Sequence, residues 1–194
     1  MSSAAFQANC SLRSAPRRQR LCSSTDAPVS RVPDVRALDA PLAITAPVVP
    51  GFGRGSRRLG FPTANLSTAT PAVAQALTQL PPGVYCGYAA LVEAATGAIA
   101  PPWHPAVMNV GTVPTFDNPQ QSFEVHLVHA FEHDFYGRLL RVVVMGFLRR
   151  ELKFASLDAL IANIRNDVQV AQQALSSMRV ELDAHAQANE AETR

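Results

Sequence analysis

The sequence of 194 residues lacks several features that mark whole classes of protein. It has no run of about 18 apolar residues, so we expect no membrane-spanning helix and no membrane partner. The formal net charge is only +2, too small for the dense basic surface of a typical nucleic-acid-binding protein. Aromatic residues make up only 7% of the chain, whereas a groove for single-stranded nucleic acid needs several beside its basic residues. We therefore predict no nucleic-acid partner.

Cysteine is equally scarce. The three cysteines, Cys10, Cys22 and Cys86, do not have metal-ligand spacing, and their odd number gives no disulfide framework. A reducing compartment is the simpler interpretation. A chain of this length suits a single domain with a hydrophobic core, and we expect a monomer.

The first 38 residues differ in composition from the rest. Four arginines lie between residues 13 and 20 among serines and alanines, and no acidic residue precedes Asp26. This composition is typical of an organellar transit peptide, since a secretory signal needs a continuous apolar segment. We predict a plastid or mitochondrial location, with a disordered tail on a cytoplasmic protein as the alternative. A domain over residues 39–180 is expected next, followed by a frayed tail at 181–194.

Segments rich in β-branched and apolar residues predict strands separated by turns. They are residues 42–49, 84–92, 103–111, 122–129 and 139–148. Prolines around the first segment indicate an edge strand or a bulged strand. Gly87 inside the second indicates a bulge or a close backbone neighbour.

Two segments have helical spacing. Pro71 suits the first turn of a short helix over residues 71–80, and Ser156 is a good N-cap for a final helix. The apolar stripe of that helix would be Leu157, Leu160, Ile161, Ile164, Val168, Ala171 and Leu175. Because strands and helices do not alternate, we predict a mainly β protein with five or six antiparallel strands curled into a small closed barrel. The C-terminal helix packs on this barrel, and an open sheet is the alternative.

The most unusual stretch is residues 51–66, which is rich in glycine and arginine. Its first three glycines allow backbone N–H groups to approach an anion closely, and its arginines add positive charge. Thr63 and Asn65 follow and offer hard oxygen ligands to a cation. We interpret the stretch as a nucleotide-phosphate and metal site. The alternative is a turn in which both side chains bond only to backbone.

Glu124 stands within an otherwise apolar strand, where an unpaired carboxylate costs free energy. It is either functional or a solvent-facing residue of a half-exposed strand. Alternation places Glu124, His126 and Val128 on one face and Phe123, Val125, Leu127 and His129 on the other. On the face of Glu124, His126 either holds substrate or is an ordinary surface histidine.

Six segments, in this order, resemble signatures of the ATP-dependent, eukaryotic-type riboflavin kinases. They are residues 51–55, 59–66, 83–85, 124–126, 134–137 and 147–149. The resemblance covers about residues 42 to 176. It implies transfer of the γ-phosphate of ATP to the 5′-hydroxyl of riboflavin, giving FMN and ADP, on a six-stranded antiparallel barrel. Phosphoryl transfer relies mainly on positioning and charge neutralisation, which suits glycine backbone, arginine and Mg²⁺.

The resemblance also implies residue roles. Glu124 would be the general base, and Thr63 and Asn65 would hold Mg²⁺, with Zn²⁺ and Mn²⁺ as alternatives, together with phosphates of ATP. Contacts with ATP are implied for Gly51, Gly53, Gly55, Arg57, Leu127, His129 and Tyr136. His129 and Tyr136 have a structural alternative, which is to fill a turn.

Flavin contacts are implied for Arg149, Leu152 and Phe154. Arg149 would offer charge to the new phosphate and Phe154 an apolar surface to the isoalloxazine ring, unless Phe154 is a plug beneath the helix. Arg150 stands where the family usually has proline, and Ala155 also departs from the pattern. We expect these departures to loosen the flavin loop.

Our first hypothesis is a monofunctional riboflavin kinase, because the residues outside the expected domain are too few for an adenylyltransferase or a phosphatase domain. The alternative is a catalytically silent barrel that binds flavin or nucleotide.

Overall fold

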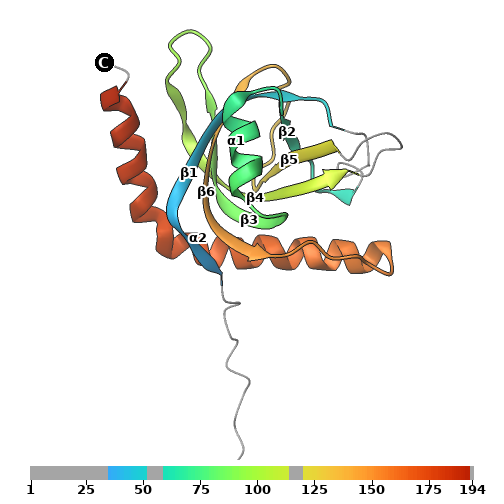
Figure 1. Cartoon of the computed structure of the whole chain (residues 1–194). Coiled ribbons are helices and arrows are strands. Elements are labelled where there is room, and N and C mark those ends of the chain that lie inside the picture. The colour runs from blue at the N-terminus through green and yellow to red at the C-terminus, as the bar shows by residue number, and fades with distance from the viewer. Residues whose placement is uncertain (1–34, 52–58, 114–119, 193–194) are drawn as a thin grey trace, which may run out of the picture. The chain divides into compact units, whose positions relative to one another are not determined.

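The computed structural model of this chain describes residues 35–51, 59–113 and 120–192. Within them, six strands form a closed antiparallel barrel in the order β1-β2-β5-β4-β3-β6 (Figure 1). The strands are β1 (Arg36–Val49), β2 (Ala64–Leu66), β3 (Gly83–Val92), β4 (Ile99–Val113), β5 (Gln120–Leu127) and β6 (Leu139–Arg149). The helices are α1 (Pro71–Gln79) and α2 (Leu157–Glu192). The predicted mainly β barrel is confirmed, and the sheet is closed rather than open.

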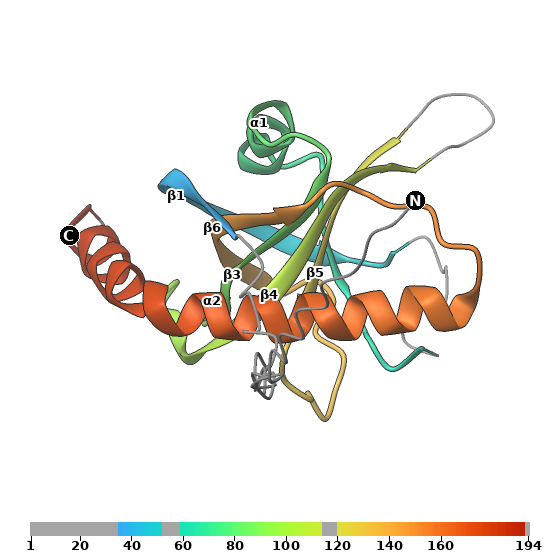
Figure 2. The same cartoon turned by 90° about the horizontal axis from the view of Figure 1, so that it is seen from below.

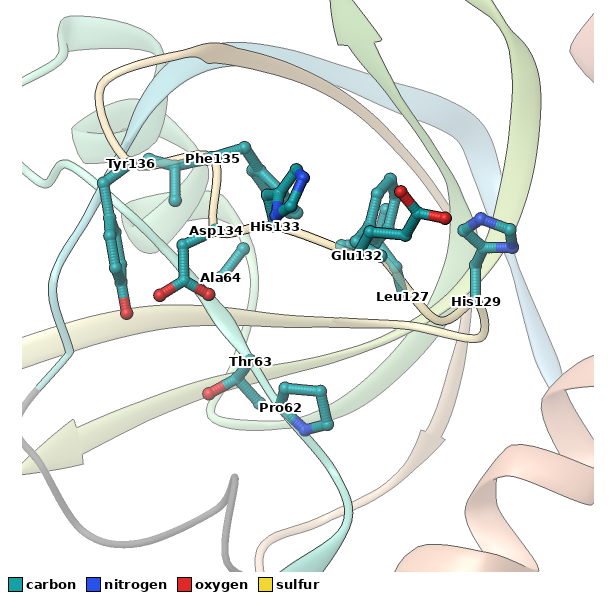
Figure 3. Close-up of a pocket in the computed structure, with 12 residues that line it drawn as sticks. Pro62, Thr63, Ala64, Leu127, His129, Glu132, His133, Asp134, Phe135 and Tyr136 are labelled. Atoms are coloured by element: carbon teal, nitrogen blue, oxygen red, sulfur yellow. The ribbon is translucent and has the colours of Figure 1, made fainter.

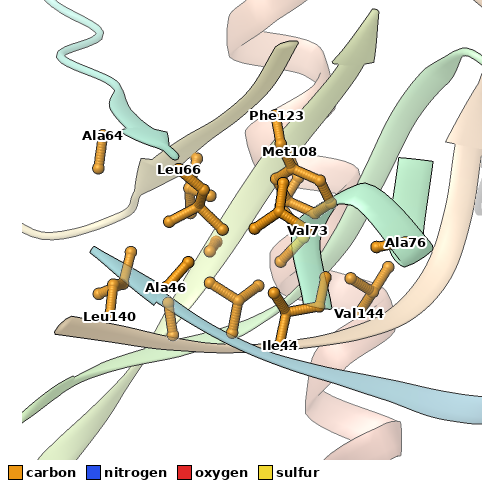
Figure 4. Close-up of a cluster of buried hydrophobic side chains, with 14 of the residues drawn as sticks. Ile44, Ala46, Ala64, Leu66, Val73, Ala76, Met108, Phe123, Leu140 and Val144 are labelled. Carbon is orange, nitrogen blue, oxygen red and sulfur yellow. The ribbon is translucent and has the colours of Figure 1, made fainter. Parts of the chain in front are cut away.

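Alternation along the strands fills the barrel with apolar side chains. Ile44 of β1, Met108 of β4 and Phe123 of β5 are fully buried there (Figure 4). The short helix α1 begins at Pro71 as predicted, and its Val73 and Ala76 join this core. Burial of these side chains supplies the main driving force for folding.

A second apolar cluster lies between α2 and the outer surface of β3, β4 and β6. In Figure 2, α2 runs across this side of the barrel. Ala171 and Leu175 are buried against Cys86 and Met145, and the Tyr88 hydroxyl donates a hydrogen bond to the Leu175 carbonyl oxygen over 3.0 Å. In the part of the chain that the structure describes, no helix is long and apolar enough to cross a membrane.

The ends of α2 differ in part from the sequence prediction. Ser156 caps the start of α2 as predicted, since its hydroxyl accepts a hydrogen bond from the Ala159 N–H over 3.2 Å. Leu157 was predicted on the buried stripe, but it is 56% exposed because the first turn extends past the second apolar cluster. The helix also continues to Glu192, where we expected a frayed tail, since the alanines and charged residues there favour helix.

The first strand begins at Arg36, earlier than the expected domain start at residue 39. Its register against β6 shifts between Ala37 and Leu42, so the bulged interpretation of the prolines is confirmed. The edge interpretation is wrong, because β1 pairs with β2 on one side and with β6 on the other. Residues 1–34 of the expected tail lie outside the described residues.

Gly87 has the close backbone neighbour that the sequence indicated. A Cβ at this position would overlap the Val143 carbonyl oxygen of β6, and the β3–β6 register shifts between Cys86 and Gly87. Only glycine fits this close approach, which brings β3 and β6 together beneath α2.

Candidate active site

Strand β5 carries Glu124 into the middle of a polar row on the outer surface of the barrel. In the strand register, Asn65 of β2 is the partner of Glu124 on one side, and Asn109 of β4 is its partner on the other. Side chains of directly opposed residues lie on the same face, with Cβ atoms about 5 Å apart. The carboxylate predicted as base and the amide predicted as metal ligand are therefore neighbours.

Asn65 is 8% exposed, and its surroundings suit a cation. Among the residues that the structure describes, none gives a hydrogen bond to its buried Oδ1 atom. Gly51 lies against the same amide, because a Cβ at Gly51 would overlap Nδ2 of Asn65. A buried amide oxygen that lacks a donor fits a hard cation such as Mg²⁺. Sequence analysis predicted no strand at Asn65, whereas the structure places it in the three-residue strand β2.

The described residues contain no cluster of three histidine, cysteine or acidic side chains that suits a metal. An all-protein cage is therefore absent from this part of the chain. Thr63 and Asn65 would hold Mg²⁺ as two protein ligands, and phosphate oxygens and water would supply the others.

A cavity of about 240 Å³ lies at the end of β5, next to Thr63 (Figure 3). Three residues predicted to contact ATP, Leu127, His129 and Tyr136, line this cavity together with Thr63. In Figure 3 the polar ends of Thr63, Asp134 and Tyr136 lie on one side of the cavity, and His129 lies on the other. The structure thus brings together residues from two separate signatures, 59–66 and 134–137, and two residues that follow the signature at 124–126.

His129 is part of an aromatic cluster and lies beyond the end of β5. Its ring stacks on His104 with centroids 4.1 Å apart, and Phe131 meets both rings edge to face. Burial, with the nearby charge of His129, lowers the pKa of His104. These contacts fix the His129 ring at the wall of the cavity.

The last residue of β6 and the segment after it carry the three residues predicted to contact flavin. Leu152 is 55% exposed and Phe154 is half-buried. The Arg149 guanidinium lies 5.8 Å from the Phe154 ring centroid and forms a two-pronged ion pair with Asp167 of α2, at 2.9 and 2.6 Å. We expected Arg149 to offer its charge to the new phosphate, but in this structure the buried Asp167 carboxylate balances that charge.

Sequence analysis did not single out two further polar residues of the site. The Nδ2 atom of Asn109 donates a 3.4 Å hydrogen bond to Oε1 of Glu151, which lies in the predicted flavin loop. Glu151 also packs onto Gly111, because a Cβ there would overlap its carboxylate. Asn109 gave the same signal as Glu124, a polar residue within an apolar strand, and that signal would have identified it.

Three residues predicted to contact ATP, Gly53, Gly55 and Arg57, lie outside the described residues.

Comparisons with known proteins show which family this chain resembles. A family model described as riboflavin kinase matches residues 38–175. The chain is 38% identical to the riboflavin kinase of Homo sapiens, over 71% of this chain and 80% of that protein. It is 44% identical to the bifunctional riboflavin kinase/FMN phosphatase of Arabidopsis thaliana, over 70% of this chain but only 33% of that longer protein. The crystal structure of riboflavin kinase from Trypanosoma brucei is similar with a TM-score of 0.55 and 28% identity, over 73% of this chain and 82% of that one.

Proposed function

The chain belongs to the riboflavin kinase family, and from that premise we propose that it transfers the γ-phosphate of ATP to the 5′-hydroxyl of riboflavin at the polar row around Glu124. The products are FMN and ADP. The FMN phosphatase activity in the name of the plant relative is not part of the proposal, since this chain spans only a third of that protein.

The observation that carries the proposal is the register that pairs Glu124 with Asn65. Phosphoryl transfer needs a base at the attacking hydroxyl and neutralised charge at the phosphate, within one site. Glu124 accepts the proton of the riboflavin 5′-hydroxyl as the oxygen of that hydroxyl bonds to the γ-phosphorus. The bond from that phosphorus to the bridging oxygen of ADP then breaks.

The two substrates approach this row from different sides. The cavity beside Leu127 and Tyr136 suits the nucleotide, and it lies three residues along β5 from Glu124, which is about 10 Å. The loop with Leu152 and Phe154 offers exposed apolar surface for a flavin ring. Mg²⁺ bound by Thr63 and Asn65 would neutralise phosphate charge between the two.

The test is conversion of riboflavin to FMN by the purified chain with MgATP, followed by chromatography. Glu124→Gln removes the base but keeps the shape of the side chain and one of its two acceptor oxygens. We expect turnover to fall by on the order of 10²-fold or more, as the loss of a general base does. Calorimetry should show that riboflavin and MgADP still bind this variant.

Asp39→Asn is the matched control, because Asp39 is an exposed carboxylate in the bulged part of β1. This control should turn over as the wild type does. Flavin binding without FMN formation by the wild type would instead support the catalytically silent barrel. Undiminished turnover by Glu124→Gln would remove Glu124 from the mechanism.

A further inference from the structure

His126 lies two residues beyond Glu124 on the same outer face of β5, and it contacts the segment that leads into Thr63. Its Nδ1 atom is 2.8 Å from the Pro62 carbonyl oxygen. Its ring also meets the Phe61 ring edge to face, with centroids 5.6 Å apart and an interplanar angle of 77°. Two contacts therefore join His126 to the residues just before the proposed metal ligand.

The backbone pairing between β2 and β5 explains why this contact matters. Only two residue pairs, Ala64 with Val125 and Asn65 with Glu124, connect the two strands. Pro62 has no N–H to donate, so it can offer the neighbouring strand only its carbonyl oxygen. The His126 side chain binds that oxygen where the regular ladder has ended.

The geometry also fixes the donor. A carbonyl oxygen can only accept, so Nδ1 of His126 carries the proton and donates a hydrogen bond to the Pro62 carbonyl oxygen. Through this bond His126 fixes the peptide carbonyl immediately before Thr63.

We propose that His126 is a positioning residue that holds the Pro62–Thr63 segment against β5 so that Thr63 and Asn65 bind magnesium-complexed nucleotide. This inference rests on the proposed function and adds a role that does not require His126 to touch substrate. Mg²⁺ demands near-ideal octahedral geometry, so a small displacement of Thr63 relative to Asn65 weakens the site. Riboflavin would bind on the other side of Glu124 and does not depend on this bond.

A pair of isosteric substitutions tests the role of Nδ1. His126→Asn places an amide N–H near the position of Nδ1, whereas His126→Gln places one near Nε2. We expect the dissociation constant for MgADP, measured by calorimetry, to stay within about threefold in the Asn variant and to rise by about tenfold or more in the Gln variant. Riboflavin affinity should be unchanged in both.

His126→Phe provides a second comparison, since it keeps a ring against Phe61 and removes the donor. It should resemble the Gln variant in MgADP affinity, and it replaces that variant if the latter does not fold. MgADP affinity equal to wild type in the variants without the donor overturns the inference. Equal losses in the Asn and Gln variants, or parallel losses for MgADP and riboflavin, also overturn it, because they indicate a general structural role. Failure of the wild type to form FMN would instead refute the proposed function.

Discussion

At the scale of single residues, the site depends on how closely side chains and backbone approach one another. Gly51 has no side chain, and the Asn65 amide occupies the space where its Cβ would be. The same amide lies beside Glu124 in the register of β2 and β5. A Cβ added at Gly51 would therefore displace the side chain of Asn65, the proposed metal ligand.

Gly51→Ala should displace the Asn65 amide and weaken magnesium-dependent nucleotide binding. We expect a loss of about tenfold in MgADP affinity, or about 1.4 kcal/mol, with little change in riboflavin affinity. Calorimetry with each ligand measures both effects.

The matched control is a double-mutant cycle with Asn65→Ala. If Gly51→Ala acts through the Asn65 amide, it should add almost nothing in the Asn65→Ala background, because its target is already gone. Additive losses in the double variant would show that Gly51 acts by another route.

At the scale of elements, an ion pair joins Arg149, at the end of β6 where the predicted flavin loop begins, to Asp167 of α2. The Arg149 side chain is 23% exposed and the Asp167 side chain only 7%. Removing one partner of a largely buried pair leaves the other charge without compensation. The pair thus contributes to the order of the loop that carries Leu152 and Phe154.

Asp167→Ala should destabilise the fold by about 3 kcal/mol in urea denaturation, since it leaves the Arg149 guanidinium partly buried and unpaired. It should also weaken riboflavin binding more than MgADP binding, because the proposed flavin loop loses its anchor. Asp158→Asn, at an exposed position in the first turn of α2, is the control and should cost no more than about 1 kcal/mol. Equal riboflavin affinity in the wild type and Asp167→Ala would show that the loop is held by other contacts.

The strands also show which parts of the fold the sequence alone predicts. The alternation of Phe123, Val125 and Leu127 predicted the buried face of β5 correctly, because a period of two is a local property. Strand β2 was missed because its three residues are too few to show that period. Only the pairing with β1 and β5, which closes the barrel, makes it a strand.

Some residues of the candidate site could be predicted from the sequence, and others could not. Thr63, Leu127 and Tyr136 were selected because the sequence resembles a family, and the structure brings them to one cavity. The partner of Arg149 was not foreseen, since local spacing predicts that this helix packs on the barrel but not that its Asp167 meets Arg149. Side chains that meet across elements depend on the tertiary fold, and a single sequence does not show them.

At the scale of the whole described barrel, Cys86 reports on global unfolding. It is fully buried between β3, β6 and α2, and burial raises the pKa of its thiol to about 12. Because the thiolate is the reactive form, we expect Cys86 to resist alkylation at pH 8 in the native protein. In a Cys10→Ser, Cys22→Ser background, its modification by iodoacetamide should follow the unfolding curve in urea. Rapid alkylation without urea would show that α2 leaves the barrel locally.

The same thiol predicts the direction of an alkaline effect on stability. The pKa of Cys86 is raised in the folded state, so its contribution to stability is complete below the unfolded thiol pKa of about 8.5 and is lost as pH rises toward about 12. Burial also raises the pKa of Tyr85, which acts in the same direction above about pH 10. The free energy of unfolding should therefore decline more steeply above pH 9 in the wild type than in Cys86→Ala, which retains Tyr85 and lacks the thiol. Parallel declines in the two proteins would mean that Cys86 ionises as easily in the folded chain as in the unfolded one, contrary to its position beneath α2.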